Sequence, residues 1–130
     1  MLAVIDTNVI VSALINPDGK PAQILNLIYA GEITTCYNAQ IMLEYETVLK
    51  RAKFGFPEAL VDAALMTIED GGFSMPSIPS KPDDVEMSDE SDRKFYDLAK
   101  TNNAFLITGN LKHFPEDSRI ITPAEALALQ

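Results

Sequence analysis

Asp6 is the residue most suggestive of chemistry, because it directly follows the apolar run of residues 2–5. A buried strand that ends on a carboxylate places that charge at the carboxyl edge of a sheet, where open α/β folds hold their ligands. Burying an unpaired carboxylate costs free energy, so such a residue needs hydrogen-bond donors or a cation. The alternative is a simple helix cap, since Asp6 and Asn8 both belong to residue types that cap helices well. Further acids at comparable positions favour the first interpretation.

Two more acids are expected on helices. The helix predicted over residues 39–53 has its apolar residues on one arc, and Glu44 and Glu46 lie on opposite flanks of that arc. The helical pattern therefore leaves both open as the residue that faces a site. Asp92 belongs to the first turn of the helix predicted over residues 91–102 and falls inside its apolar arc. A carboxylate at that inward position costs folding free energy, so we expect Asp92 to serve a functional site. The alternative is a stabilising interaction with the positive helix N-terminus.

A fourth polar position is the turn Thr108-Gly109-Asn110, which follows a compact apolar strand. Oxygen-bearing side chains that converge on a sheet edge suit a hard cation such as Mg²⁺ or Mn²⁺. Such ions support the hydrolysis of phosphoryl esters, because they lower the pKa of a bound water and neutralise phosphate charge. Zinc is disfavoured because His113 and Cys36 are the only soft ligands. We expect His113 in a loop near the mouth of the site and Cys36 in the core.

These candidates need a fold that brings them to one edge. Strands are expected over residues 2–6, 34–37, 105–108 and 120–121, and helices over residues 7–14, 21–31, 39–53, 57–71, 91–102 and 123–129. Such alternation predicts a three-layer α/β/α sandwich with a mostly parallel central sheet. Right-handed crossovers then place the carboxyl ends of the strands at one common edge. Residues 73–78 could add an edge strand because of Pro76, and residues 79–90 form a polar acidic connection that we expect to be mobile.

Length and charge narrow the possible functions. The 130 residues are expected to form one domain, residues 1–130, and the formal net charge of −9 argues against bulk attraction to nucleic acid or anionic membrane. A nuclease with a local basic patch remains compatible with this charge. The densest basic patch comprises Lys50, Arg51 and Lys53, with Arg93, Lys94 and Lys112 elsewhere, and each is expected to be a solvated surface charge. No apolar run approaches the roughly 20 residues of a membrane span, and no signal-peptide pattern is visible, so we expect a cytoplasmic protein.

The order and spacing of these motifs resemble those of PIN-domain ribonucleases, in particular the VapC-like toxins of bacterial and archaeal toxin–antitoxin systems. The resemblance spans nearly the whole chain. It rests on VIDTNV (4–9), LEYETVL (43–49), SDRKF (91–95), LITGNLKHFP (106–115) and ITPAE (121–125). Each motif is weak alone, and their joint order makes the likeness specific.

The resemblance implies roles for individual residues. The implied ligands of Mg²⁺ or Mn²⁺ are Asp6, Glu44 and Asp92, which selects Glu44 over Glu46. Thr7 and Asn8 are implied to support the first ligand, and Thr108 to stand behind the ligands. Many members of the family carry a fourth acid where this chain has Asn110. An amide oxygen can still bind a metal or hold a water at this catalytic position, but it brings no charge.

By the same resemblance, the expected activity is that of a metal-dependent endoribonuclease, with RNA as substrate, a cognate antitoxin as partner and a homodimer as the assembly. An alternative is a PIN-like fold with a weakened site that acts as an RNA- or protein-interaction module, which Asn110 and the net charge of −9 keep open. A haloacid-dehalogenase-like phosphatase also begins with a strand that ends on aspartate. Its chemistry needs a second acid two residues later, where this chain has Asn8.

Overall fold

Five parallel strands form the centre of the computed structural model, which describes residues 1–130. They are β1 (Leu2–Ile5), β2 (Thr34–Tyr37), β3 (Gly72–Ser74), β4 (Phe105–Ile107) and β5 (Ile120–Ile121). Their order in the sheet is β3-β2-β1-β4-β5, and every neighbouring pair is parallel. Parallel pairing needs a crossover between successive strands, and helices supply most of these crossovers.

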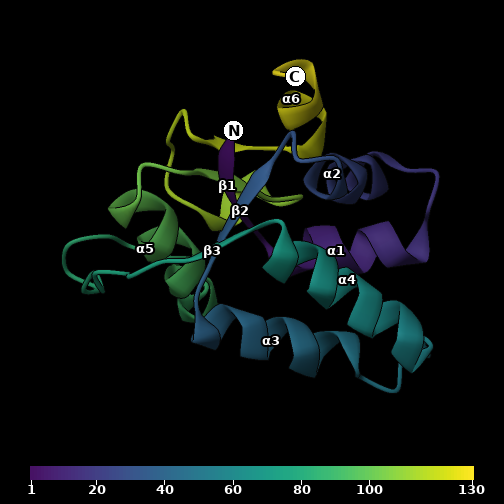
Figure 1. The fold of residues 1–130 in the computed structure, drawn as a ribbon. Coiled ribbons are helices and arrows are strands. Elements are labelled where there is room, and N and C mark those ends of the chain that lie inside the picture. The colour runs from purple at the N-terminus through teal and green to yellow at the C-terminus, as the bar shows by residue number, and fades with distance from the viewer.

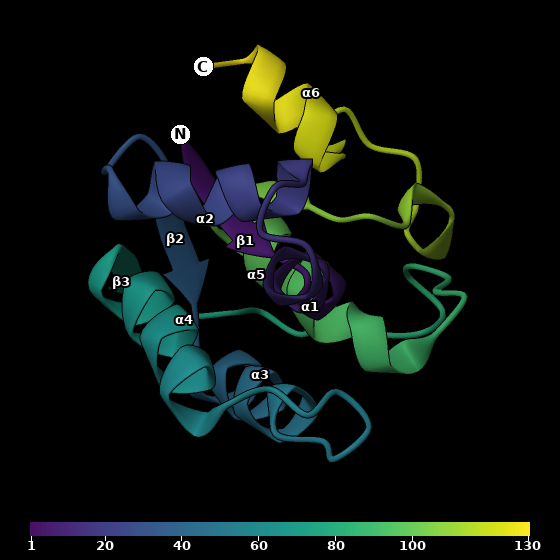
Figure 2. The ribbon, with the colours of Figure 1, turned by 90° about the vertical axis from the view of Figure 1, so that its right-hand side faces the viewer.

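The helices cover both faces of this sheet. They are α1 (Thr7–Ile15), α2 (Lys20–Tyr29), α3 (Ala39–Leu49), α4 (Glu58–Asp70), α5 (Arg93–Thr101) and α6 (Pro123–Ala128), with short 3₁₀ turns η1 (Glu90–Asp92) and η2 (Leu111–His113). Helix α5 lies on one face and α1, α2, α4 and α6 lie on the other, while α3 lies beyond the carboxyl ends of the strands (Figures 1 and 2). The predicted three-layer α/β/α sandwich is therefore confirmed. No helix combines the length and the apolar character needed to cross a membrane.

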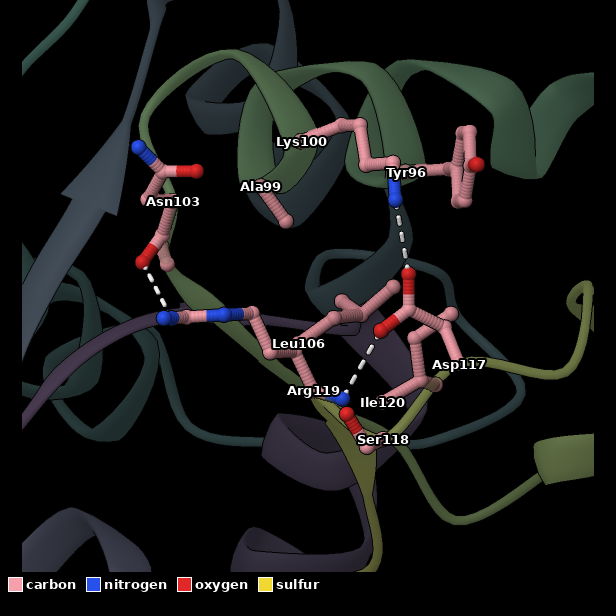
Figure 3. Close-up of a pocket in the computed structure, with 10 residues that line it drawn as sticks. Tyr96, Ala99, Lys100, Asn103, Leu106, Asp117, Ser118, Arg119 and Ile120 are labelled. Carbon is pink, nitrogen blue, oxygen red and sulfur yellow. Dashed lines mark hydrogen bonds and ion pairs between the residues drawn. The ribbon is translucent and has the colours of Figure 1, made fainter.

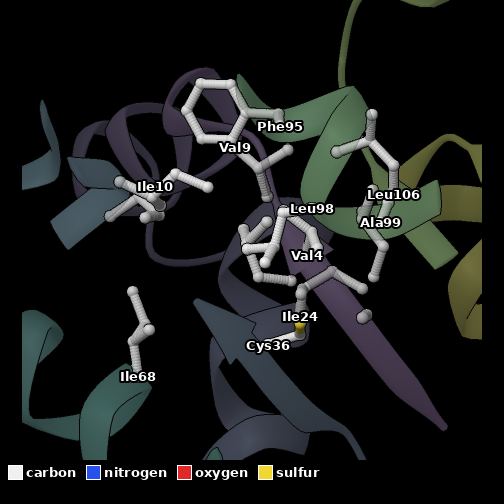
Figure 4. Close-up of a cluster of buried hydrophobic side chains, with 14 of the residues drawn as sticks. Val4, Val9, Ile10, Ile24, Cys36, Ile68, Phe95, Leu98, Ala99 and Leu106 are labelled. Atoms are coloured by element: carbon white, nitrogen blue, oxygen red, sulfur yellow. The ribbon is translucent and has the colours of Figure 1, made fainter. Parts of the chain in front are cut away.

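The core joins the two helical layers through the central strands. Leu98 and Ala99 of α5 lie beside Val4 and Leu106 of the sheet (Figure 4). Twenty-six buried residues form this one cluster, so the strands are apolar on both faces, as a covered parallel sheet requires. Cys36 is 1 % exposed within the cluster, which confirms its predicted place in the core.

One buried tyrosine fixes α3 against the end of the central strand. The hydroxyl of Tyr45 donates to the carbonyl of Ile5, and its ring stacks on Phe95 at 6.3 Å between ring centres. Because a buried phenol needs a hydrogen-bond partner, this contact sets both the position and the rotation of α3. Its neighbour Glu44 is thereby carried to the carboxyl edge of the sheet.

Two predicted elements have different bounds in the structure. The helix predicted to run to residue 53 ends at Leu49, and residues 50–55 form consecutive turns that finish at Gly55 with φ +61°. A left-handed residue ends helical winding, and glycine adopts it without steric cost. The predicted edge strand shrinks to β3. Its first residue must be glycine, because a Cβ at Gly72 would lie 1.9 Å from the carbonyl oxygen of Thr35.

The acidic connection of residues 79–90 is anchored rather than free. Asp97 of α5 is buried and accepts hydrogen bonds from the backbone N and the hydroxyl of Ser80, at 3.0 and 2.6 Å. Arg93 is also buried and donates to the carbonyl of Val85 at 2.7 Å. The expectation of a mobile connection overlooked these two charged residues of α5, which need buried partners and find them in the connection.

Candidate active site at the carboxyl edge of the sheet

The strand order reverses between β1 and β4, because the chain leaves β1 toward β2 on one side and places β4 on the other. Such a switch point opens a crevice outside the carboxyl ends of the two strands. Asp6 follows β1 and Thr108 follows β4, and the hydroxyl of Thr108 donates to Oδ2 of Asp6 at 2.7 Å. The backbone N of Asp6 donates to the carbonyl of Ile107 at 2.9 Å, which fixes the carboxylate at the crevice.

Asp6 is a buried acid among other acids. It is 6 % exposed. The pKa of Asp6 is raised to about 6, chiefly by burial; the nearby charges of Asp92 and Glu44 add to the rise, and the hydrogen bond from Thr108 opposes it. These mutual effects show that the three carboxylates lie close enough to repel one another. A cation between them would remove this repulsion.

Glu44 reaches the crevice from α3, and two residues hold it. The hydroxyl of Thr7 donates to Oε2, and the ammonium of Lys94 lies 2.6 Å from Oε1. The competing candidate, Glu46, forms a surface ion pair with Lys50 at 3.1 Å. The structure thus places Glu44 at the site and Glu46 outside it, the choice that the helical pattern left open.

Asp92 approaches from the start of α5. Burial raises the pKa of Asp92, and the nearby charge of Asp89 raises it further. Asp89 caps η1 by accepting from the backbone N of Ser91 at 2.9 Å, and its side chain lines the same cleft. Nδ1 of His113 lies 3.4 Å from Oδ2 of Asp92, which places His113 at the mouth of the cleft as expected.

Asn110 contacts the site through His113. Its side-chain Nδ2 lies 2.9 Å from Nε2 of His113, and its backbone N donates to the hydroxyl of Thr108 at 3.0 Å. Asn110 is absent from the lining of the cleft, whereas His113 is part of it. Asn8 has a bracing role, because its Oδ1 accepts from the backbone N of Gly109 at 3.2 Å and ties α1 to the turn after β4.

Several of these residues line a cleft of about 410 Å³ that is bounded by α1, α3 and the 3₁₀ turns η1 and η2. Its lining includes the acids and, farther along the chain, Val48 of α3 and Arg51 and Phe54 of the turns that follow α3. Its complete lining is Asp6, Thr7, Asn8, Val11, Ser12, Glu44, Val48, Arg51, Phe54, Asp89, Ser91, Asp92 and His113.

The donor set fits a hard divalent cation in chemistry and charge, since it offers carboxylate oxygens and no thiolate. No three carboxylate, imidazole or thiolate groups lie close enough to hold one ion. Each acid instead contacts a partner of its own. These partners are a hydroxyl for Asp6, an ammonium for Glu44 and an imidazole for Asp92. Lys94 already acts as a cation for Glu44, so a metal would take over a role that the fold now gives to a lysine.

Sequence reasoning missed Lys94, Arg51 and Phe54. Lys94 was expected to be a solvated surface charge, yet its side chain is only 15 % exposed and its ammonium also donates to the carbonyl of Ser91. A signal was present, because a lysine in the first turn of a helix opposes the positive helix N-terminus and needs a compensating acid. Arg51 was noted only as part of the densest basic patch, because the helix predicted to residue 53 hid the turn in which it lies, and Phe54 was not singled out.

Comparison with known proteins agrees with this geometry. A family model described as PIN domain matches residues 3–112. A protein of Methanocaldococcus jannaschii, named as uncharacterized protein MJ1680, is 34 % identical over 109 residues, which cover 82 % of this chain and 69 % of that protein. No solved structure shows a significant match to the chain. The extent of the family match, together with an acidic cleft at the β1/β4 switch point, shows that the chain belongs to the PIN-domain family.

Proposed function

We propose that the protein is a Mg²⁺- or Mn²⁺-dependent endoribonuclease. PIN domains are generally nucleases. The observation that carries the proposal is the meeting of Asp6, Glu44 and Asp92 at one cleft, where Asp6 is almost fully buried beside two like charges. Such an arrangement is costly for folding alone, and perturbed acids in a cleft are typical of a functional site.

The chain's own residues would orient the reaction. Asp6, Glu44 and Asp92 would hold the ion, while the hydroxyls of Thr108 and Thr7 keep the first two carboxylates in place. A bound Mg²⁺ or Mn²⁺ supplies a Lewis acid and a water of lowered pKa for phosphodiester hydrolysis. Partners that orient ligands in this way are generally worth 10- to 100-fold in metal affinity or activity.

The direct test is cleavage by the pure protein. Single-stranded RNA should be cut internally in the presence of Mn²⁺ and left intact when EDTA is added, and DNA of the same sequence should be cut more slowly. Asp83→Asn serves as a matched control, since Asp83 is an exposed acid of the 79–90 connection. Intact RNA under every metal condition would contradict the proposal.

A toxin role is the finer part of the proposal. If the protein is the toxin of a toxin–antitoxin pair, its antitoxin should insert a basic side chain into the acidic cleft. Arginine would fit best, because its planar fork can bridge two carboxylate oxygens. Expression should then arrest growth, and co-expression of the neighbouring gene should relieve the arrest. Continued growth and no binding to that gene's product would contradict this role.

A second candidate is a non-cleaving interaction module. Two observations favour it: Asn110 brings no charge, and Glu44 is already neutralised by Lys94 at 2.6 Å. The module would bind RNA or a protein with the same affinity in Mn²⁺ and in EDTA and would leave RNA uncut. Metal-dependent cleavage would exclude it.

A further inference from the structure

The far end of the active-site cleft holds two residues that metal-dependent cleavage does not use. Arg51 and Phe54 belong to the turns that join α3 to α4, beyond the end of α3 in Figure 2. Both line the same cleft of about 410 Å³ as Asp6 and Glu44. Arg51 is the single lysine or arginine in that lining, and it forms no ion pair within the chain.

Helical spacing places Arg51 on the same side as Glu44, about two turns farther along the chain. Glu44, Val48 and Arg51 are four and three residues apart, which places them on one face. Winding continues past the last residue of α3, because the backbone N of Arg51 donates to the carbonyl of Val48 at 3.1 Å. Seven residues of helix span about 10 Å, which is the length of about three stacked nucleotides.

Phe54 is a preformed aromatic platform at that end. Its ring stacks on Phe56 with centres 5.3 Å apart and an interplanar angle of 9°. Its backbone N donates to the carbonyl of Arg51 at 3.1 Å, which ties the two residues together in one turn. The ammonium of Lys53 lies 5.1 Å from the ring centre of Phe54, so a second cation accompanies the ring.

We infer that this end of the cleft is a subsite for single-stranded RNA, in which Arg51 binds a backbone phosphate and Phe54 stacks a base. The inference rests on the proposed ribonuclease function and names the path of its substrate. An aromatic face beside a basic side chain is the combination by which proteins bind unpaired strands without reading sequence. A duplex is a poorer occupant, because its base faces are covered by neighbouring base pairs.

The absence of tryptophan from the sequence makes the platform directly observable. Phe54→Trp, in an Asp6→Asn background that prevents cleavage, introduces one indole at the platform. Titration with a single-stranded RNA oligonucleotide should quench its fluorescence, and duplex RNA of the same sequence should quench it much less. Tyr29→Trp in the same background is the control, because Tyr29 is 84 % exposed on α2 and lies outside the cleft.

Binding measurements separate the two contacts. Phe54→Ala should weaken single-stranded RNA binding by about 5- to 150-fold and leave the salt dependence unchanged. Arg51→Gln should reduce the slope of log affinity against log salt by about 0.7, the value for one phosphate contact on a single strand. Arg51→Lys should restore that slope. Arg119→Gln is the matched control, because Arg119 is exposed and lies outside the cleft.

The outcomes distinguish this subsite from the ribonuclease function itself. RNA cleavage by the wild type, combined with no quenching of Phe54→Trp and an unchanged salt slope in Arg51→Gln, would overturn the subsite and leave the function standing. Absence of both RNA binding and RNA cleavage in the wild type would overturn both. Quenching that is equal for Phe54→Trp and Tyr29→Trp would also overturn the subsite, because it would show that RNA contacts the protein surface in general and not the Phe54 site in particular.

Discussion

The two edges of the sheet hold their charged residues in opposite ways. At the carboxyl edge, Asp6, Glu44 and Asp92 share one cleft, and burial together with the charges of Asp92 and Glu44 raises the pKa of Asp6. At the amino edge, a pocket of about 250 Å³ lies beside the starts of β4 and β5, and Lys100 and Asp117 pair across it at 2.9 Å (Figure 3). There the pKa of Asp117 is lowered by the backbone hydrogen bond from Arg119 and by Lys100.

This difference favours the carboxyl edge as the functional site. Lys100 and Asp117 pair with each other, and the guanidinium of Arg119 donates to the carbonyl of Asn103, so each charged group at the amino-edge pocket has a hydrogen-bond partner. The carboxyl edge has an excess of acids that only Lys94 and a histidine offset. A raised pKa of one buried acid is therefore more informative about function than the presence of a pocket.

The largest expected effect is the loss of activity when the acidic edge is neutralised. Asp6→Asn and Asp92→Asn should each reduce Mn²⁺-dependent RNA cleavage by about 1000-fold or more, because a metal ligand stabilises charge in the transition state. Asp117→Asn at the amino edge should retain activity. Full activity in either cleft variant, with contaminating nuclease excluded, would remove the functional contrast between the edges.

The next effect is an opposite response of the two edges to pH. Because the pKa of Asp6 is about 6 in the folded protein against an ordinary 3.8, its contribution to stability is full below pH 3.8 and is lost as pH rises through 6. Asp117, whose pKa is lowered, contributes above 3.8 and loses its contribution as pH falls. The metal-free Asp6→Asn protein should therefore gain about 3 kcal/mol over the wild type between pH 4 and pH 7. Urea unfolding at both pH values in EDTA measures this, and a pH-independent difference would contradict it.

Removal of the resident cation should have a smaller effect. Lys94→Met keeps the volume of the side chain but frees Glu44, which Lys94 contacts at 2.6 Å. Mn²⁺ binding should tighten by about tenfold, or about 1.4 kcal/mol, because the ion no longer competes with an ammonium. Lys100→Met, which removes the lysine paired with Asp117, should leave Mn²⁺ binding unchanged. Calorimetric titration of both variants makes the comparison, and weaker binding in Lys94→Met would show that Lys94 supports the ion.

The smallest effect is expected at Asn110. Asn110→Asp should tighten Mn²⁺ binding by about fivefold or less, because the side chain bonds His113 and lies outside the lining of the cleft. The added charge acts at a distance and is partly screened. A gain of more than tenfold in calorimetry would mean that residue 110 turns into the cleft and serves as its fourth acid.

The fold and part of the site could be predicted from local sequence patterns. Asp6 was identifiable because an apolar run ends on it, and strand–helix alternation was enough to predict the parallel sheet. The choice of Glu44 over Glu46 depends on the hydrogen bond between Tyr45 and Ile5, a contact between residues 40 positions apart that no helical wheel contains. The pairing of Lys94 with Glu44 is equally nonlocal.

Helix bounds were the second limit. Ala52 continues the apolar period of α3, so the prediction carried the helix past its end at Leu49. The breaking residues that the sequence offers, the left-handed Gly55 and the Pro57 that caps α4, lie beyond residue 53 and give no signal for an end at Leu49. The turns of residues 50–55 bring Phe54 into the cleft.

The anchoring of the 79–90 connection gives a protease a way to report on the active site. Glu86 is exposed but is followed by the buried Met87, and the segment is tied to α5 by Arg93 and Asp97. A glutamyl endopeptidase can cut after Glu86 only when this segment detaches, and detachment loosens the helix that begins beside Asp92. The digestion rate in native buffer thus follows local opening of α5, and a ligand that orders the cleft should slow it.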